Sequence, residues 1–454
     1  MRKRTRPLTL DGQHVDGRLQ NVQLFPHRSA ELRAVATRSQ EVVILAALVG
    51  AVTGLVIAGL DWLVAEQLLP HVQGLDHWAM ALCPLGGLLV SYAARRWLGA
   101  GASPATADEY IRAFHDDQHA LPVRAFGARL IASIATVGSG VPMGLEGPSL
   151  YAGAAIGSTV QRRLPRSLRP RDYRTLLVAG GAAGVAAIFK APATGAVFAL
   201  EVPYQDDLAR RMLLPALVAS ATGYLTFVAF LGTEALFPVA DGAGFTIRDL
   251  LGAAALGAFA GIAARLFARS LRIAKSLATQ PRPLLRTAAV GVLLGAAFVA
   301  GRALTGESLL IGPGYEVIRW AAQPKHAVMT IVAILVLRCL ATAAAVAGGG
   351  TGGIFIPLAA GGALIGALVG NAIGTDDMTL FIVIGVAAFL GAGYRVPLAS
   401  VMFVAETTGR PSFIVPGLIA AVAGELMMGR SSVTAYQRFP EDPEPTNATT
   451  DAAT

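Results

Sequence analysis

The stretch "GSGVPMGLEGPSLYAG" (residues 138–153) combines five glycines, two prolines and a single acid, Glu146, between apolar runs. Glycine breaks a helix and allows a ligand to approach the backbone closely. Proline is favoured at the first position of a helix, where no amide donor is needed. The stretch therefore predicts a helix that begins inside an apolar region, with free backbone amides at its start.

The chain around this stretch is strongly apolar. Of its 454 residues, 54% are hydrophobic and 15% are charged, whereas soluble domains carry about 25% charged residues. Runs long enough to span a bilayer recur between residues 41 and 429. Examples are 42–60, 212–231, 250–267, 287–303, 328–347 and 378–393. We therefore expect a multi-pass protein of the cell membrane.

The net charge of +8 lies in short basic flanks, among them 2–6, 95–96, 162–174 and 210–211. This distribution is typical of cytoplasmic loops and of contacts with lipid headgroups, and it does not indicate nucleic-acid binding. We expect both termini in the cytoplasm.

The two cysteines, Cys83 and Cys339, lie in apolar segments without CxxC spacing. Neither a disulfide nor a metal site is expected from them, and no cofactor is expected.

Three pairs of segments indicate an internal repeat, because they occur in the same order at a nearly constant offset. They are "EGPSLYAGAAIG" (146–157) with "FIPLAAGGALIG" (355–366), "FKAPATGAVFALE" (189–201) with "YRVPLASVMFVAE" (394–406), and "GAVTG" (50–54) with "GAFAG" (257–261).

The repeat predicts the organisation of the chain. Its expected parts are a basic N-terminal segment (1–39), a first membrane repeat (40–235), a second membrane repeat (245–435) and a disordered C-terminal tail (436–454). Such repeats are typical of secondary transporters and related channels, which bind their substrate where the repeats meet near the bilayer midplane.

The corresponding interruptions, 138–157 and 348–366, predict an anion site. The start of a helix carries free amides and about half a positive elementary charge. Two such starts can converge on one ion without a basic side chain. Glu146, whose symmetry partner is Phe355, can occupy this site when ionised and leave it when protonated. The alternatives are glycines that serve helix packing and a glutamate with a purely structural role.

Together these elements resemble the CLC family of chloride channels and chloride/proton exchangers, in its prokaryotic form without CBS domains. "GLEGP" (144–148) is similar to the family's G(K/R)EGP motif and "GGIFIP" (352–357) to its GxFxP motif. The resemblance implies an all-α membrane fold of two inverted repeats with about 18 helices, many of them short or broken. It also implies a homodimer with one ion pathway in each subunit.

The resemblance further implies roles for single residues. Glu146 would be the gate and the proton-coupling group. The central anion would be bound by the backbone amides of Glu146, Gly147, Ile354 and Phe355, at helix starts marked by Gly144, Pro148, Gly353 and Pro357. Ser103, in "GAGASP" (99–104), is a further candidate for anion binding.

Three positions depart from the family pattern. Leu145 replaces a basic residue, Val202 replaces the inner glutamate of many exchangers, and Val433 replaces a central tyrosine, with Tyr436 nearby but out of register. Val202 cannot carry a proton, and the neighbouring Glu201 points about 100° away on a helix. We therefore expect a chloride channel or a loosely coupled exchanger, with a proton-coupled chloride/proton antiporter as the alternative. The missing hydroxyl at Val433 predicts weak chloride affinity.

Two other classes of function fit less well. The chain has seven histidines but no HExxH motif and no convincing nucleophile motif, so no catalytic residue is expected. A transporter of a cation or another solute would need oxygen-rich carboxylate sites in its core. The expected partners are chloride or another small monovalent anion, protons and the lipid bilayer.

The remaining polar residues of the apolar runs have simpler interpretations. Lys190 and Arg395, which are symmetry partners, are expected to cap carbonyls or to reach the membrane surface. Glu201 and Glu406 are expected at solvated helix ends. Arg338 is expected to pair inside the protein, with a partner that the sequence does not indicate.

Overall fold

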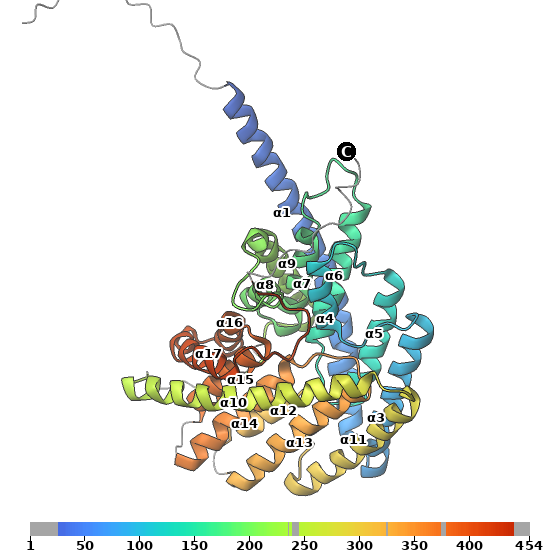
Figure 1. The fold of residues 1–454 in the computed structure, drawn as a ribbon, viewed down its shortest axis with the longest axis vertical. Coiled ribbons are helices and arrows are strands. Elements are labelled where there is room, and N and C mark those ends of the chain that lie inside the picture. The colour runs from blue at the N-terminus through green and yellow to red at the C-terminus, as the bar shows by residue number, and fades with distance from the viewer. Residues whose placement is uncertain (1–25, 235, 238–244, 324–325, 374–377, 440–454) are drawn as a thin grey trace, which may run out of the picture. The chain divides into compact units, whose positions relative to one another are not determined.

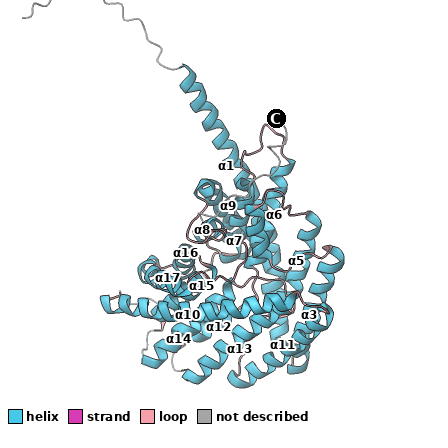
Figure 2. Ribbon diagram, in the orientation of Figure 1, coloured by secondary structure: helices cyan, strands magenta, loops and turns pink. Residues whose placement is uncertain are grey.

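A computed structural model describes residues 26–234, 236–237, 245–323, 326–373 and 378–439, with side chains from residue 40 onward. The described residues are almost wholly helical and contain two isolated β-bridges but no strand (Figure 2). The all-α prediction is thus confirmed for this part of the chain. Contacts divide the chain into Met1–Glu41 and a body from Val42 onward, and the packing described below lies within the body.

The helices follow one another in two series (Figure 1). The first comprises α1 (Pro26–Asp61), α2 (Leu69–Gly74), α3 (His77–Ala93), α4 (Thr106–His115), α5 (Val123–Gly138), α6 (Glu146–Arg163), α7 (Arg174–Phe189), α8 (Pro192–Glu201) and α9 (Leu213–Leu231). The second comprises α10 (Ile247–Ala278), α11 (Pro283–Thr305), α12 (Tyr315–Ala321), α13 (Val328–Ala347), α14 (Phe355–Ile373), α15 (Thr379–Tyr394), α16 (Pro397–Thr408) and α17 (Ile414–Met428).

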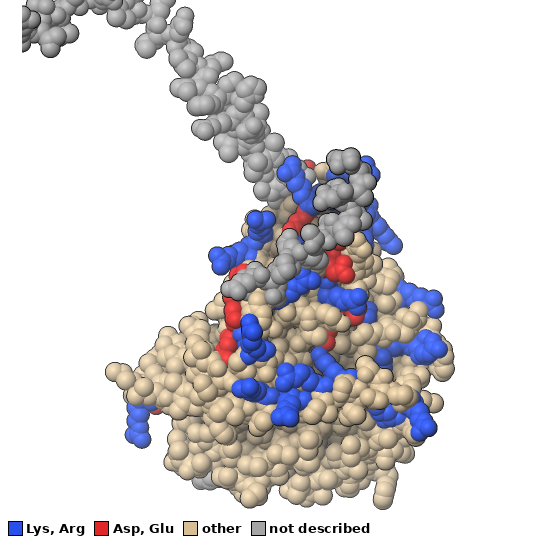
Figure 3. Space-filling model, in the orientation of Figure 1, with Lys and Arg blue, Asp and Glu red and all other residues tan. Residues whose placement is uncertain are grey.

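Eight helices of the described part are long and apolar enough to cross a membrane, and α7 and α15 are shorter apolar helices. On the face shown in Figure 3, basic side chains gather over the middle and upper parts, and the lower part, where α13 and α14 lie, carries almost no charge. Charged residues avoid the hydrocarbon core of a bilayer. The chain is therefore a multi-pass membrane protein.

The two series pack in the same way. Helix α6 packs on α7 as α14 packs on α15, and α7 contacts α8 and α9 as α15 contacts α16 and α17. A β-carbon added to Gly153 would lie 1.9 Å from the carbonyl oxygen of Gly180, and one added to Gly362 would lie 2.4 Å from that of Gly385. The matched glycines of the sequence repeat are thus positions where two helices approach too closely for any larger residue.

Two glutamates connect the repeats, and here the expectation of solvated helix ends is wrong. Glu201, at the end of α8 and 6% exposed, accepts hydrogen bonds from the amides of Leu398 (3.1 Å) and Ala399 (2.8 Å) at the start of α16. Glu406 of α16 accepts hydrogen bonds from the amides of Ala193 (2.9 Å) and Thr194 (2.6 Å) at the start of α8. Each acid therefore satisfies the free amides and the positive end of the other helix.

Lys190 and Arg395 end α7 and α15 in the left-handed conformation, with φ of 52° and 58°. The amine of Lys190 donates to the carbonyl of Leu231 (3.3 Å), and the guanidinium of Arg395 donates to that of Gly429. The expected carbonyl capping is confirmed in both repeats.

Arg338 is buried, and its guanidinium donates to backbone carbonyls in the segment between α11 and α12. These are the carbonyls of Leu309 (2.9 Å), Gly312 (3.0 Å) and Pro313 (2.5 Å). They supply the internal partner that the sequence does not indicate.

The structure describes part of each terminal segment that the sequence predicts. Helix α1 already begins at Pro26, within the predicted basic segment. At the other end, Gln205 donates its amide to the carbonyl of Arg438 (2.8 Å), and Arg438 donates to that of Pro203 (3.2 Å). Arg438, in the predicted disordered tail, is therefore paired with the loop after α8. Residues 1–25 and 440–454 lie outside the described residues.

Candidate functional site

The starts of α6 and α14 meet at an antiparallel bridge. The amide of Gly144 donates to the carbonyl of Gly353 (2.8 Å), and the amide of Gly353 donates to that of Gly144 (2.7 Å). The bridge lies two residues before Glu146 and two before Phe355, which begin the two helices. The two predicted helix starts therefore converge, with opposite chain directions, as an inverted repeat requires.

The side chain of Glu146 lies at the start of α14, in the other repeat. Its carboxylate accepts a hydrogen bond from the amide of Ile356 (3.0 Å) and is within hydrogen-bonding reach of the amides of Phe355 and Glu146 itself. The residue is 3% exposed, and the apolar run around it supplies no basic partner. The backbone amides and the charge of the helix start thus compensate this acid.

The glycines of the bridge make room for the carboxylate. A β-carbon on Gly144 would lie 1.9 Å from Oε2 of Glu146, and one on Gly353 would lie 2.6 Å from Oε1. The space beside α14 therefore fits the carboxylate of Glu146 closely and has no room for a side chain at residue 144 or 353.

A cavity of about 360 Å³ leads to the same helix start. Its lining comes from α3, α4, α10, α11, α13 and α15, from the segments before α4, α6 and α14, and from the segment after α17. Among the lining residues are Ser103, Thr106, Gly353, Ile354, Tyr394 and Val433. The cavity thus reaches Ile354, next to the amides that bind Glu146.

The charges along this cavity favour an anion. Its lining contains three basic residues, Arg95, Lys275 and Arg286, and one acid, Asp108, which is paired with Lys275 (2.6 Å). Arg95 donates to the carbonyl of Gly349 (2.7 Å) and Arg286 to that of Ala347 (2.9 Å). A cleft lined by one sign of charge raises the local concentration of ions of the opposite sign.

Ser103, the candidate from the sequence, is brought to the cavity. Its hydroxyl accepts a hydrogen bond from the amide of Ala105 (3.2 Å), and its carbonyl accepts one from Arg129 (2.9 Å). Arg129 is buried and forms an ion pair with Glu109 (2.9 Å). The loop that carries Ser103 is thus bonded to Arg129 of α5 and forms part of the cavity lining.

The departures from the family pattern occupy different places. Val433 is buried and lines the cavity, and its carbonyl accepts a hydrogen bond from Lys275 (3.0 Å). Tyr436 is 54% exposed and is not part of the cavity lining. Leu145 and Val202 are both buried.

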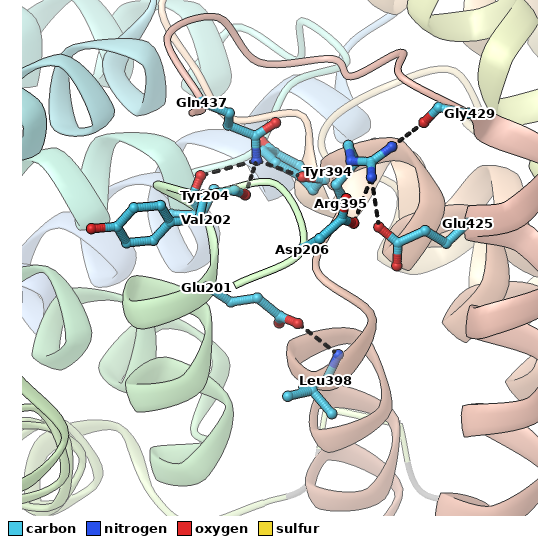
Figure 4. A network of polar contacts seen from close by, with 10 residues as sticks. All are labelled: Glu201, Val202, Tyr204, Asp206, Tyr394, Arg395, Leu398, Glu425, Gly429 and Gln437. Carbon is cyan, nitrogen blue, oxygen red and sulfur yellow. Dashed lines mark hydrogen bonds and ion pairs between the residues drawn. The ribbon is translucent and has the colours of Figure 1, made fainter. Parts of the chain in front are cut away.

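A polar network lies beside Val202 (Figure 4). The amide nitrogen of the Gln437 side chain donates to the carbonyls of Val202 (3.0 Å), Tyr204 (3.3 Å) and Tyr394 (2.9 Å). Next to it, Arg395 pairs with Asp206 (2.6 Å) and with Glu425 of α17 (3.5 Å). The carboxylate of Glu201 points instead to the start of α16, so it does not take the place of the missing inner acid.

Sequence reasoning missed four residues of this region: Thr106, Ile356, Tyr394 and Glu425. Glu425 could have been found, because an acid inside an apolar run is a functional candidate in a membrane protein. Tyr394 also carried a signal, since its repeat partner is Phe189 and the two differ by one hydroxyl. Among the described residues, no three His, Cys, Asp or Glu side chains gather as metal ligands.

Comparisons with known proteins show which proteins this chain is similar to. A ClcB-like chloride channel protein of Ralstonia nicotianae is 28% identical over 386 residues, which cover 80% of this chain and 86% of that protein. The H⁺/Cl⁻ exchange transporter ClcA of Klebsiella pneumoniae is 27% identical over 412 residues, 85% of each chain.

Two solved structures have the same fold. A CLC-type fluoride/proton antiporter gives a TM-score of 0.72 at 23% identity, covering 90% of this chain and 99% of that one. A slow cyanobacterial Cl⁻/H⁺ antiporter gives 0.74 at 20% identity, covering 86% and 94%.

The family described as voltage gated chloride channel matches residues 86–429. This range contains the Gly144–Gly353 bridge, Glu146 and the matching helices α6–α9 and α14–α17. The chain therefore belongs to the CLC family.

Proposed function

We propose that the protein exchanges a small monovalent anion, with chloride as the first candidate, for protons across the cell membrane. The observation that carries the proposal is the carboxylate of Glu146 on the amides of α14. A channel or a loosely coupled exchanger is the leading expectation from the sequence, but relatives named as exchange transporters and antiporters favour the alternative, a proton-coupled antiporter. Membership of a family of channels and transporters also makes an enzyme or a cation carrier a poor fit.

Glu146 would act as both gate and proton carrier. When ionised, its carboxylate takes the amides at the start of α14, which are also the donors that an anion needs. When protonated, it loses its charge and its attraction to the helix start, so an anion can replace it. The site then holds a carboxylate or an anion, and each exchange between them moves one proton.

The inner end of the proton route would not use a glutamate at the family position. Val202 is buried and cannot carry a proton, and Glu201 is bound to α16. We infer that water completes the route. We therefore expect the proton step, and with it coupled exchange, to be slow.

The proposal is tested with purified protein in liposomes that contain chloride. An inward proton gradient should drive chloride against its own gradient, and the reversal potential should shift steadily with the pH difference. A reversal potential that stays at the chloride Nernst value at every pH difference would identify a channel. Vesicles that retain chloride would exclude chloride as the ion, and fluoride and nitrate would then be measured in the same way.

The assembly and orientation are part of the proposal. We expect a homodimer, with both termini in the cytoplasm. The mass in mild detergent and in lipid measures the first, and a monomeric mass in both would contradict it. Labelling of single cysteines placed in each terminus, from either side of the membrane, measures the second.

A further inference from the structure

We propose that two hydroxyls, those of Tyr394 and Thr106, complete the anion site on its inner side. They would replace the central tyrosine whose family position is Val433. This inference rests on the proposed anion transport and concerns the residues that bind the anion. Each hydroxyl lies beside one of the two helix starts.

Tyr394 ends α15 and lies beside the start of α14. It is 1% exposed, it lines the cavity, and its hydroxyl is within hydrogen-bonding reach of the backbone of Ile354. The ring is fixed by Phe355 and Phe198, with centroids 6.0 Å and 5.5 Å away. A rigid ring therefore presents its polar end at an amide of the predicted anion site.

Together, this hydroxyl and the carboxylate of Glu146 lie within reach of three successive backbone amides at the start of α14. Tyr394 reaches Ile354, and the carboxylate reaches Phe355 and Ile356. Tyr394 lines the cavity and Glu146 is not part of its lining, so an anion that arrives along the cavity meets the hydroxyl before the carboxylate. It competes with the phenol oxygen for the amide of Ile354 and gains the O–H as a donor.

The repeat supplies an internal comparison for this tyrosine. Phe189 occupies the equivalent position in the first repeat and also packs on Phe355, with ring centroids 4.5 Å apart. Phenylalanine thus suffices to fill such a position. The hydroxyl of Tyr394 is not needed for packing and is available to a ligand.

Thr106 lies beside the other helix start. It is 1% exposed, it lines the cavity, and its hydroxyl has no hydrogen-bond partner among the described residues. A β-carbon on Gly147 would lie 2.7 Å from this hydroxyl, so the hydroxyl adjoins a residue whose amide belongs to the predicted anion site. A buried polar group without a partner is costly, and an anion would provide that partner.

The test is chloride binding to purified protein in chloride-free buffer, measured by calorimetry. Tyr394→Phe removes one oxygen and keeps the ring, and Thr106→Val keeps the shape of the side chain. A hydrogen bond to a charged group is lost in each, so we expect the dissociation constant to rise about tenfold or more. Proton-driven chloride uptake is measured on the same preparations.

Tyr110→Phe is the matched control. Tyr110 is fully buried, and its hydroxyl donates to the carbonyl of Ala199 (2.7 Å), away from the cavity lining. This variant should lose stability but keep its affinity for chloride. The double variant Tyr394→Phe with Val433→Tyr, which moves the hydroxyl to the family position in the same cavity, should recover part of the lost affinity.

The outcomes separate this inference from the proposed function. If the unaltered protein binds and moves chloride and both single variants bind it equally well, the two hydroxyls are not ligands. If affinity falls equally in Tyr110→Phe, the effect is structural and the inference fails. If the unaltered protein binds neither chloride, fluoride nor nitrate, the proposed function itself fails, and this inference with it.

Discussion

The first repeat differs from the second at the helix starts, although their packing is the same. Both have a glycine run, a proline in the first helical turn and a glycine against the next helix. Yet Glu146 in the first repeat corresponds to Phe355 in the second, and Phe189 corresponds to Tyr394. The ionisable group belongs to one half and the hydroxyl to the other.

Because of this difference, the two repeats have different roles at the site. The first repeat provides an acid, and the second provides the amides that receive it, at Phe355 and Ile356. A fully symmetric molecule would place two acids or none at the Gly144–Gly353 bridge. Two acids side by side at the bridge would repel each other. A site without an acid would have no proton carrier. The helical scaffold is thus duplicated, whereas the acid and the hydroxyl each occur in only one repeat.

The largest effect is expected from Glu146→Gln, which removes the ionisable group of the first repeat. In the unaltered protein, chloride flux should rise as the pH falls, because protonation releases the carboxylate from α14. In Glu146→Gln, the flux should be independent of pH, and proton movement should fall to the level of protein-free vesicles. Proton and chloride fluxes are measured together in liposomes, with the exposed Glu307→Gln as control.

That prediction also tests the alternative interpretation of Glu146 as a structural residue. A structural glutamate would leave proton coupling intact in every variant that folds. Coupled transport by Glu146→Gln, at the ratio of the unaltered protein, would contradict the role of this residue as proton carrier.

The bridge glycines give the next largest effect, and the two repeats should respond differently. All three atoms nearest to a β-carbon on Gly144 belong to the carboxyl group of Glu146, whereas a β-carbon on Gly353 also lies 2.6 Å from the backbone nitrogen of Gly147. Gly144→Ala should therefore displace only the carboxylate and lower the number of protons moved per chloride. Gly353→Ala should lose folded protein.

Flux ratios and thermal unfolding measure the two outcomes. Gly127, which has nothing within 4 Å of an added β-carbon, provides the control Gly127→Ala. A normal coupling ratio in Gly144→Ala would show that the carboxylate does not need the position that it occupies beside α14.

Part of this site is predictable from the sequence because it depends on local pattern. A glycine run, a first-turn proline and an isolated acid predict a helix start with a bound carboxylate, and the repeat predicts a second start. The contacts of Tyr394, Thr106, Glu201 and Glu406 depend instead on which segments meet after folding. Glu406 binds amides 212 and 213 positions earlier in the chain, and no local pattern identifies such a partner.

The glutamates that connect α8 and α16 test the symmetry of the scaffold. Glu406 accepts three hydrogen bonds, from the amides of Ala193 and Thr194 and from the hydroxyl of Thr194, whereas Glu201 accepts two. Glutamine keeps one acceptor but loses the charge at the helix start, so each substitution should cost about 1 kcal/mol. Thermal unfolding in detergent should rank Glu406→Gln as the less stable variant. Equal or reversed losses would contradict the count of hydrogen bonds as the cause.

The smallest effect is expected at Lys190, the cation that ends α7. Its amine makes one carbonyl bond, to Leu231 at 3.3 Å, and its backbone adopts φ of 52°. Lys190→Gly removes the bond, worth about 1 kcal/mol, and relieves a left-handed conformation that costs a side chain a similar amount, about 1–2 kcal/mol. The two changes oppose each other, so the melting temperature should stay close to that of the unaltered protein and coupling should be normal. A loss of stability as large as that of Glu406→Gln would mean that the charge of Lys190 acts on more than the end of α9. The first repeat would then use its cation as extensively as the second uses Arg395, which pairs with Asp206 and Glu425.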